Sequence, residues 1–408
     1  MKRVVVTGMA GVTSLGNDWD IIKQNMQAGK TGIKYMPEWN VYEDLNTRLA
    51  APIVDFKPPS HYTRKQTRSM GRVSLLSTVA TEMALDKAGL LGDECLSDGS
   101  TGVAYGSSTG STEPMKAFGA MLNEGTCRGV TATSYIRMMG HTAPVNISLF
   151  FGIKGRIIVT STACTSGSQG IGYAYEAIKF GKQKVMIAGG AEELCPTEAS
   201  VFDTLYATSI RNGEPHLTPR PFDKDRDGLV IGEGAGTLIL EELEFAKARG
   251  ANIIAEVIGF GTNCDAAHVT QPTAETMQVA MELGLQDAGL DASNVGYISA
   301  HGTATETGDV AESKATEAVF GSQIPISSLK SYYGHSLGAC GAIEAWLGLE
   351  MMRDKWFAPT VNLDNVSDEC AKLDYIIGEG REIDTDYMVS NNFAFGGINT
   401  SLVFKRWA

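Results

Sequence analysis

A cysteine between a predicted strand and a predicted helix is the side chain of this sequence best placed for covalent chemistry. Cys164 follows the β-branched run 157–160 and directly precedes small residues that predict a helix start. At a helix N-terminus the dipole and free backbone N–H groups favour the thiolate, so we expect a thiol pKa lowered from about 8.5. The same N–H groups can stabilise an oxyanion. Cys164 is therefore a candidate nucleophile.

Two histidines strengthen this interpretation. Of the six histidines in the chain, His301 and His335 stand just after the predicted strands 297–300 and 324–328, in turns that contain glycine. Ligands collect at the carboxyl ends of strands in α/β sheets, so these side chains are expected to meet. A buried structural role is the alternative for each of the three residues taken alone. Together they favour nucleophilic catalysis.

A layered α/β scaffold is needed to bring these residues together. Short apolar runs alternate with helices of small residues, and several runs lack polar alternates, as in strands buried on both faces. The predicted strands are 4–7, 101–105, 157–160, 185–188, 237–240, 253–258, 297–300, 324–327, 387–390 and 401–405.

The two halves of the chain share one order of elements. The helix endings M-A-L-D-K-A-G-L at 83–90 and L-G-L-Q-D-A-G-L at 283–290 are each followed by a short strand and a turn rich in Gly, Ser and Thr. In each half a later strand leads into a small-residue helix. Chance is the alternative, because glycine commonly ends helices. We expect a duplicated α/β fold with an N-terminal half at 1–250 and a C-terminal half at 251–408.

The composition is that of a folded globular protein. The 408 residues are 43% hydrophobic and 20% charged, with a formal net charge of −13, which argues against nucleic-acid binding. The seven cysteines are scattered and include no C-x-x-C pair, so we expect a reducing cytoplasm and neither disulfides nor zinc. No apolar run approaches the roughly 18 residues of a membrane span, so no membrane association is expected.

Two local motifs suggest a metal or a cofactor but have the wrong spacing. The acidic motif at 223–228 opens like a calcium loop, yet its glutamate stands one position before the twelfth place. The glycines after the first strand do not match the dinucleotide-binding spacing. We expect no metal and no cofactor.

Five motifs, in order over essentially the whole chain, resemble those of the β-ketoacyl-acyl-carrier-protein synthases, and the elongating synthases I and II match best. The resemblance implies a thiolase-like fold, with two duplicated α/β halves in a five-layer αβαβα arrangement, usually dimeric. The motifs are T-A-C-T-S-G at 162–167, R-P-F-D-K-D-R-D-G at 220–228, H-G-T at 301–303, K…G-H-S-L-G at 330–338 and N-N-F-A-F-G-G at 391–397.

The resemblance also implies catalytic roles. Cys164 would hold the acyl chain, while His301 and His335 would assist loss of CO2 from a malonyl thioester. A thiolate suits a thioester carbonyl, and two imidazole N–H donors can stabilise the resulting enolate without a metal. Lys330 would orient and support the site, with Glu344 as a structural acid beside it.

Substrate-binding roles follow in the same way. Backbone N–H groups of Cys164 and Phe395 would form an oxyanion hole, and Phe395 with Phe393 would lie on a gating loop. Thr303 and Thr305 would hold the phosphopantetheine arm. Thr109 and Phe202 would line the acyl pocket.

The implied partner is acyl carrier protein, in its acyl and malonyl forms. Arg64, Arg68 and Arg72 fall at i, i+4 and i+8, one face of a helix, with Lys65 beside them. A solvated helix face is the alternative; the resemblance implies that Arg64, Lys65 and Arg68 form a docking patch. A local basic field can bind an acidic carrier despite the negative net charge. The protein would act as a homodimer, or as a heterodimer with a chain-length-factor homologue.

Three departures from the family pattern concern the acyl substrate. Tyr332 and Tyr333 replace residues usual in fatty-acid synthases, Glu306 replaces a proline, and Thr109 replaces an aliphatic residue. The expected reaction is a decarboxylative Claisen condensation in fatty-acid elongation, giving 3-oxoacyl carrier and CO2. The alternative is the same chemistry in an aryl-polyene or type II polyketide pathway. The presence of Cys164 disfavours a non-catalytic chain-length partner, and the absence of a papain-like signature disfavours a Cys-His hydrolase.

Overall fold

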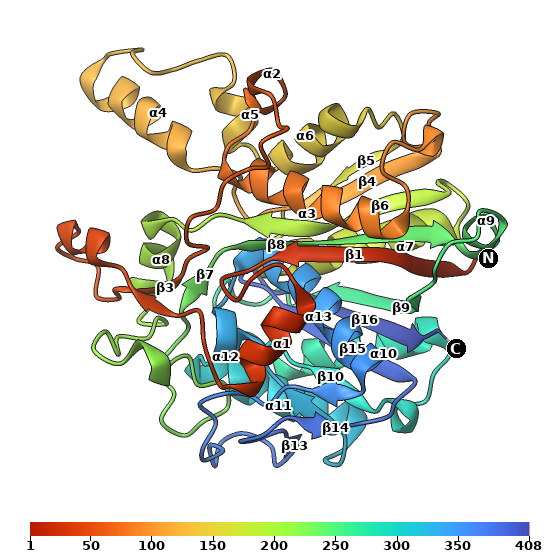
Figure 1. Ribbon diagram of the computed structural model, residues 1–408. Helices are drawn as coiled ribbons and strands as arrows, with labels where there is room; N and C mark the ends of the chain where they lie inside the picture. Colours follow the sequence, from red (N-terminus) through yellow and green to blue (C-terminus); the bar gives the residue numbers. More distant parts are fainter. Residues whose placement is uncertain (408) are drawn as a thin grey trace.

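All ten predicted strands form, and with one short addition they make a single mixed sheet within residues 1–407, the part of the chain that the computed structural model describes (Figure 1). The added strand is β13 (Asp374–Tyr375), at one edge of the sheet. The ten predicted strands are β1 (Val4–Val12), β4 (Thr101–Gly106), β5 (Ile157–Val159), β6 (Val185–Glu192), β8 (Gly234–Glu242), β9 (Ala255–Cys264), β10 (Tyr297–Ser299), β11 (Pro325–Ser327), β15 (Tyr387–Phe393) and β16 (Ile398–Arg406).

The strand order demonstrates the duplication. It is β5-β4-β6-β8-β1 in one half and β11-β10-β15-β16-β9 in the other, so both run third, second, fourth, fifth, first. The directions also repeat, since β4 is parallel to β5 and β6, and β10 is parallel to β11 and β15. A short antiparallel pairing of β1 with β9 joins the halves. The boundary at residue 250 stays a prediction.

The helices complete the five expected layers (Figure 1). Helix α3 (Arg72–Ala88) covers the outer face of the first half, and α10 (Ala274–Ala288) covers that of the second. Helices α7 (Ser166–Lys179) and α13 (Cys340–Asp354) lie between the halves and contact strands of both. The catalytic candidates all lie near this central layer.

The outer helices pack in the same way in both halves. A Cβ at Gly8 of β1 would lie 2.3 Å from the carbonyl oxygen of Ala84, and one at Gly259 of β9 would lie 2.3 Å from that of Gly284. Only glycine permits such an approach of helix to strand. Both helices also end at a left-handed glycine, with φ of 68° and 61°.

Strand β5 is an exception to the strands buried on both faces that the sequence predicts in general. Ile157 is 42% exposed and Val159 is 45% exposed. The reason is position, because β5 forms the free edge of the sheet. An apolar edge strand with unpaired backbone groups is typical of an interface.

No helix within residues 1–407 is long and apolar enough to span a membrane. Two smaller sheets, β2-β3-β7 and β12-β14, complete the strands. The remaining elements are α1 (Trp19–Gln27), α2 (Arg64–Thr67), α4 (Glu113–Glu124), α5 (Ser134–Met138), α6 (Thr142–Phe151), α8 (Pro196–Asp203), α9 (Leu243–Ala248), α11 (Glu306–Phe320), α12 (Lys330–Tyr333), β2 (Lys34–Tyr35), β3 (Leu49–Ala51), β7 (Ile231–Gly232), β12 (Trp356–Phe357) and β14 (Arg381–Glu382).

Candidate active site

Cys164 lies in a 3₁₀ turn at Ala163–Thr165, between β5 and α7. Ala163 adopts a left-handed φ of 51°, which a residue with a Cβ occupies only at a cost. The equivalent turn of the second half repeats this feature at Leu337, with φ of 44°, and places Gly338 where the first half has Cys164. The two turns meet in the interior, and the first carries a cysteine where the second has a glycine.

The structure brings both predicted histidines to this cysteine. His335 Nε2 lies 3.0 Å from Cys164 Sγ. The rings of His301 and His335 meet edge to face, with centroids 5.1 Å apart. The cysteine sulfur and one nitrogen from each ring all lie within 4.8 Å of one another.

Hydrogen bonds assign the same tautomer to both imidazoles. The Leu337 N–H donates to His335 Nδ1 at 3.3 Å, so the ring proton of His335 is on Nε2. Lys330 Nζ lies 3.2 Å from His301 Nδ1, and an ammonium can only donate. Burial and the charge of Lys330 hold the pKa of both histidines well below the usual range. Each is therefore a neutral imidazole that keeps an Nε2–H donor.

Lys330 is a buried cation held by a partner on the central helix. It forms an ion pair with Glu344 of α13. The second oxygen of Glu344 accepts a hydrogen bond from Asn392 Nδ2 at 2.6 Å. Burial alone would lower the pKa of Lys330, but Cys340 and Glu344 raise it on balance, so the ammonium stays charged. Asn392 belongs to the 391–397 motif, but nothing in that motif predicted its contact with Glu344.

The thiol of Cys164 does not have the lowered pKa that its turn predicted. Burial raises the pKa of Cys164 to about 11, although the backbone N–H of Phe395 and the charge of Lys330 act to lower it. Desolvation wins because the side chain is only 3% exposed. The resting residue is a thiol at neutral pH, and His335 Nε2–H can donate to the thiolate once it forms.

Three phenylalanines surround the cysteine. The backbone N–H groups of Phe395 and Cys164 both act to lower the pKa of the Cys164 thiol, and their role as an oxyanion hole stays a prediction. The Phe395 ring meets Phe202 edge to face at 5.7 Å, and Phe202 packs against the cluster around Cys164. The ring of Phe393 lies 6.1 Å from that of His301.

A cavity of about 520 Å³ opens beside Cys164, His301 and His335. Thr303 and Thr305 line it, and their hydroxyl oxygens lie 2.9 Å apart. The structure does not bring Thr109 to this cavity, since Thr109 is exposed and donates to the Gly110 carbonyl.

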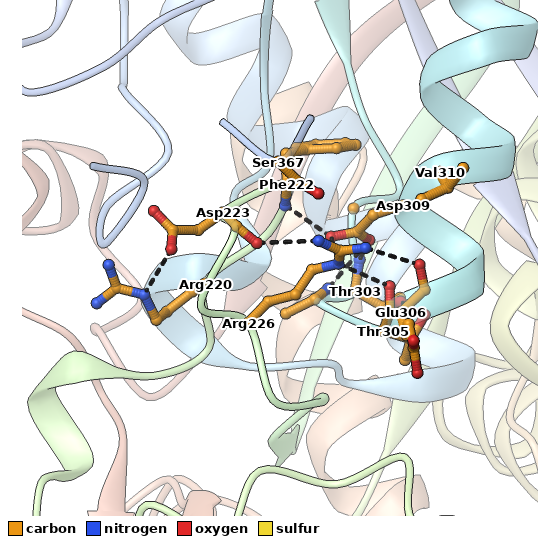
Figure 2. Close-up of polar contacts among 12 residues, drawn as sticks. Arg220, Phe222, Asp223, Arg226, Thr303, Thr305, Glu306, Asp309, Val310 and Ser367 are labelled. Atoms are coloured by element: carbon orange, nitrogen blue, oxygen red, sulfur yellow. Dashed lines mark hydrogen bonds and ion pairs between the residues drawn. The ribbon is translucent and has the colours of Figure 1, made fainter. Parts of the chain in front are cut away.

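The carboxylate of Asp309, on α11, holds the loop that carries the two threonines (Figure 2). Asp309 Oδ1 accepts from the N–H groups of Thr303 at 3.0 Å and Ala304 at 3.1 Å. Its other oxygen accepts from the Phe222 N–H at 2.6 Å. One carboxylate therefore joins the threonine loop to the 220–228 motif.

Arg226 completes this anchor (Figure 2). Its guanidinium donates to the carbonyls of Asp223 at 3.0 Å and Glu306 at 2.8 Å. The 220–228 motif, which resembles a calcium loop, therefore binds the start of α11 and the threonine loop through hydrogen bonds. Its first carboxylate, that of Asp223, accepts backbone N–H groups of Asp225, Asp364 and Asn365.

A second carboxyl group of α11, that of Glu312, holds the backbone of His301. Glu312 accepts from the N–H groups of His301 at 2.7 Å and Gly302 at 2.6 Å. Sequence reasoning missed both Glu312 and Asp309, because a helix of mixed polarity gives no local sign of which carboxylates turn inward.

The predicted docking residues Arg64, Lys65 and Arg68 are all exposed. The prediction that Arg72 shares their helix face is wrong. Helix α2 ends at Thr67 and a new helix begins at Arg72, whose guanidinium pairs with Glu233 at 2.6 Å.

Comparison with known proteins shows the family of the chain. Family models described as the N-terminal and C-terminal domains of β-ketoacyl synthase match residues 1–246 and 254–364. The 3-oxoacyl-acyl-carrier-protein synthase 2 of Vibrio harveyi is 38% identical, over 100% of this chain and 99% of the relative.

Two solved structures are similar over their full length. A β-ketoacyl synthase from Burkholderia phymatum is 62% identical with a TM-score of 0.99, covering 100% of both chains. The ishigamide ketosynthase/chain length factor is 30% identical with a TM-score of 0.90, also covering 100% of both chains. With its thiolase-like fold and its Cys, His and Lys in place, the chain belongs to the β-ketoacyl synthase family and is an acyltransferase of the ketosynthase type.

Proposed function

We propose that the chain elongates fatty acyl groups by condensing an acyl group on Cys164 with malonyl-acyl carrier protein, giving 3-oxoacyl-acyl carrier protein and CO2. The observation that carries this proposal is the pair of neutral, buried Nε2–H donors beside a buried cysteine. Such a pair suits an enolate oxygen, which is an anion only while the reaction proceeds.

In the first step, the Cys164 sulfur loses its proton and attacks the thioester carbonyl of the acyl carrier. The backbone N–H groups of Cys164 and Phe395 would support the oxyanion, as both already favour negative charge on the sulfur beside it. The carrier thiol then leaves with a proton, and the acyl group stays on Cys164.

In the second step, malonyl carrier enters and its thioester oxygen accepts from His301 and His335. The carboxylate leaves as CO2 and its electron pair forms the enolate, which attacks the acyl-Cys164 carbonyl. The carbon–sulfur bond of the acyl-enzyme breaks and releases the Cys164 thiolate, which takes up one proton from solvent to restore the thiol. N–H groups stabilise each negative charge that develops on oxygen in these two steps, so we expect neither metal nor cofactor.

The substrate arm and its carrier have candidate contacts on the chain. Thr303 and Thr305 present hydroxyls to the cavity that leads from Cys164. Arg64, Lys65 and Arg68 are exposed cations suited to an acidic carrier protein. The free thiol nucleophile suits a reducing cytoplasm.

The edge strand β5 supports a dimer. Ile157 and Val159 present apolar side chains, and the outer edge of the strand pairs with no other strand in residues 1–407. We expect a homodimer through this edge; a monomeric mass by light scattering at micromolar concentration would contradict it.

A heterodimer is the second candidate, because the similar ishigamide ketosynthase was solved with a chain length factor. The same similarity supports a specialised polyene or polyketide pathway as the second candidate function.

The test of the function is product analysis. Carrier protein loaded with an acyl primer and carrier protein loaded with malonyl are incubated with the enzyme. The mass of the intact carrier protein is then measured. We expect a 3-oxoacyl carrier two carbons longer than the primer, together with released CO2. Absence of this product from every acyl primer would refute the proposal.

A further inference from the structure

The thiol of Cys340 forms a hydrogen bond with the backbone of the nucleophile. Cys340 is the first residue of α13, and its side chain is completely buried. Its Sγ lies 3.2 Å from the carbonyl oxygen of Cys164, with the thiol as the donor. Burial raises the pKa of Cys340 well above its usual range, so the group keeps the proton that it donates. Cys340 therefore acts on the nucleophile as a hydrogen-bond donor.

The duplication of the fold shows that this bond is not a routine feature of such a turn. Each of the two equivalent turns leads into a helix, α7 from Ser166 and α13 from Cys340, so these two residues occupy equivalent positions. Ser166 Oγ donates to the Ala163 carbonyl of its own turn at 2.7 Å. Cys340 instead donates to the turn of the opposite half. The bond therefore joins the two halves of the fold at the nucleophile.

Glycines allow the starts of α7 and α13 to approach closely enough for this bond. A Cβ at Gly167 would lie 2.9 Å from the backbone nitrogen of Ala342, and one at Gly341 would lie 2.9 Å from that of Ser168. Glycine is the residue that permits such a close approach of two backbones. The position of the Cys340 thiol is therefore fixed by the packing of two helices.

The same thiol adjoins the charged network of the site. Cys340 and Glu344 stand at i and i+4, on one face of α13. Asn392 Nδ2 donates to Glu344 at 2.6 Å and lies 3.8 Å from Cys340 Sγ. Because Glu344 pairs with Lys330, Cys340 contacts both the network that holds the cation and the turn that carries the nucleophile.

The turn that accepts this bond has a strained backbone. Ala163, directly before Cys164, has a left-handed φ of 51°. Such a conformation persists where the surrounding contacts hold it in place. The bond from Cys340 is one of these contacts, and it acts on the residue whose sulfur attacks the substrate.

We propose that Cys340 is a positioning residue for the nucleophile, whose thiol holds the backbone of Cys164 so that the sulfur meets the incoming thioester carbonyl. The inference rests on the proposed function, because it concerns the acylation of Cys164. Cys340 does not line the cavity of the site, so it acts through Cys164 and not on the substrate. Because small misplacements of a reacting atom slow a reaction strongly, loss of the bond should lower the rate of acylation and leave carrier binding unchanged.

The experiment measures single-turnover acylation of Cys164 by intact mass, over a range of concentrations of carrier protein loaded with a saturated acyl primer. Cys340→Ala removes the donor, and we expect the maximal rate to fall about fivefold or more, with the half-saturating concentration unchanged. Cys340→Ser supplies a hydroxyl donor in place of the thiol and should stay within about twofold of the wild type. The matched control is Cys95→Ala, at a buried thiol that packs with α3, which should be acylated like the wild type.

Two further measurements separate positioning from general damage to the site. Alkylation of Cys164 by iodoacetamide at fixed pH should change less than about twofold in Cys340→Ala, because burial dominates the thiol pKa and a small reagent needs no fixed approach. Release of CO2 from malonyl carrier by Cys164→Gln/Cys340→Ala should equal that by Cys164→Gln, because His301 and His335 keep their contacts.

Acylation of Cys340→Ala at the wild-type rate overturns the proposal. Equal slowing in Cys340→Ala and Cys340→Ser also overturns it, since packing and not the donor would then be the cause. A matching fall in alkylation or in CO2 release assigns Cys340 a general structural role and overturns it too. If the wild type itself takes up no acyl group, the proposed function fails, and this inference fails with it.

Discussion

His335 Nε2 and Cys164 Sγ lie 3.0 Å apart, although the two residues are separated by 171 positions in the chain. Because the Leu337 N–H occupies Nδ1, the His335 proton is on the nitrogen that contacts the sulfur. His335 is thus a hydrogen-bond donor to Cys164 and has no free lone pair there to act as a base. This separates the ketosynthase site from a Cys-His hydrolase, in which the histidine removes the thiol proton.

The reactivity of Cys164 in the free enzyme should rise steeply with pH. Its pKa is raised to about 11, so the thiolate fraction grows about tenfold per pH unit between pH 7 and 9. The rate of iodoacetamide alkylation, followed by the mass of the Cys164 peptide, should rise in parallel without a plateau. A plateau near pH 7 would show a lowered thiol pKa. Cys127, which is exposed, serves as the internal reference.

The rate of malonyl decarboxylation should stay constant between pH 8 and pH 6. Burial and Lys330 hold the pKa of His301 and His335 well below the usual range, so both rings stay neutral over this interval. The measurement is CO2 release by Cys164→Gln, which removes the acylation step. A loss of activity with a midpoint between pH 6 and 7 would mean that a histidine is protonated there, contrary to this arrangement.

Replacing one partner of the buried Lys330–Glu344 ion pair should lower the free energy of unfolding more than its share of replacing both partners together. Glu344→Gln leaves the Lys330 ammonium buried without its counter-charge, so we expect a loss of unfolding free energy of about 3–5 kcal/mol. Lys330→Met should also destabilise, and the double variant Lys330→Met/Glu344→Met should lose less than the sum of the two. Urea unfolding gives all the values. Strict additivity would show that the pair is not coupled.

Asp309→Asn should weaken the binding of malonyl-acyl carrier protein. The carboxylate accepts N–H groups from both the threonine loop and Phe222, and an amide would turn a donor toward one of them. We expect KM for malonyl carrier to rise about tenfold or more, with a smaller change in kcat. Asp225→Asn, at an exposed acid of the neighbouring motif, is the control and should leave KM unchanged. An equal rise of KM in both variants would contradict a specific role of Asp309.

The strands and the reactive side chains were predictable from sequence because their signals are local. A predicted strand that leads into a turn of small residues with a chemically distinctive side chain marks Cys164, His301 and His335 without knowledge of the sheet. The duplication was also predictable, since the helix endings at Gly89 and Gly289 keep the same turn chemistry in both halves.

Properties that depend on packing were not predictable. The direction of the Cys164 pKa shift depends on how much of the chain covers the sulfur, which the turn alone does not specify. The exposure of Ile157 depends on β5 being the edge strand, and therefore on the order of the whole sheet. The inward carboxyl groups of Glu312 and Asp309 resemble ordinary helix acids until their surroundings are known.

The most direct test separates the roles of the cysteine and the histidine pair. Wild type, Cys164→Ala, His301→Ala and His335→Ala are each incubated with acyl carrier and then with malonyl carrier, and enzyme mass and CO2 release are recorded. We predict that both histidine variants gain the acyl mass but lose decarboxylation by about a hundredfold or more, whereas Cys164→Ala gains no acyl mass. Undiminished decarboxylation in both histidine variants, or acyl mass on Cys164→Ala, would contradict the account.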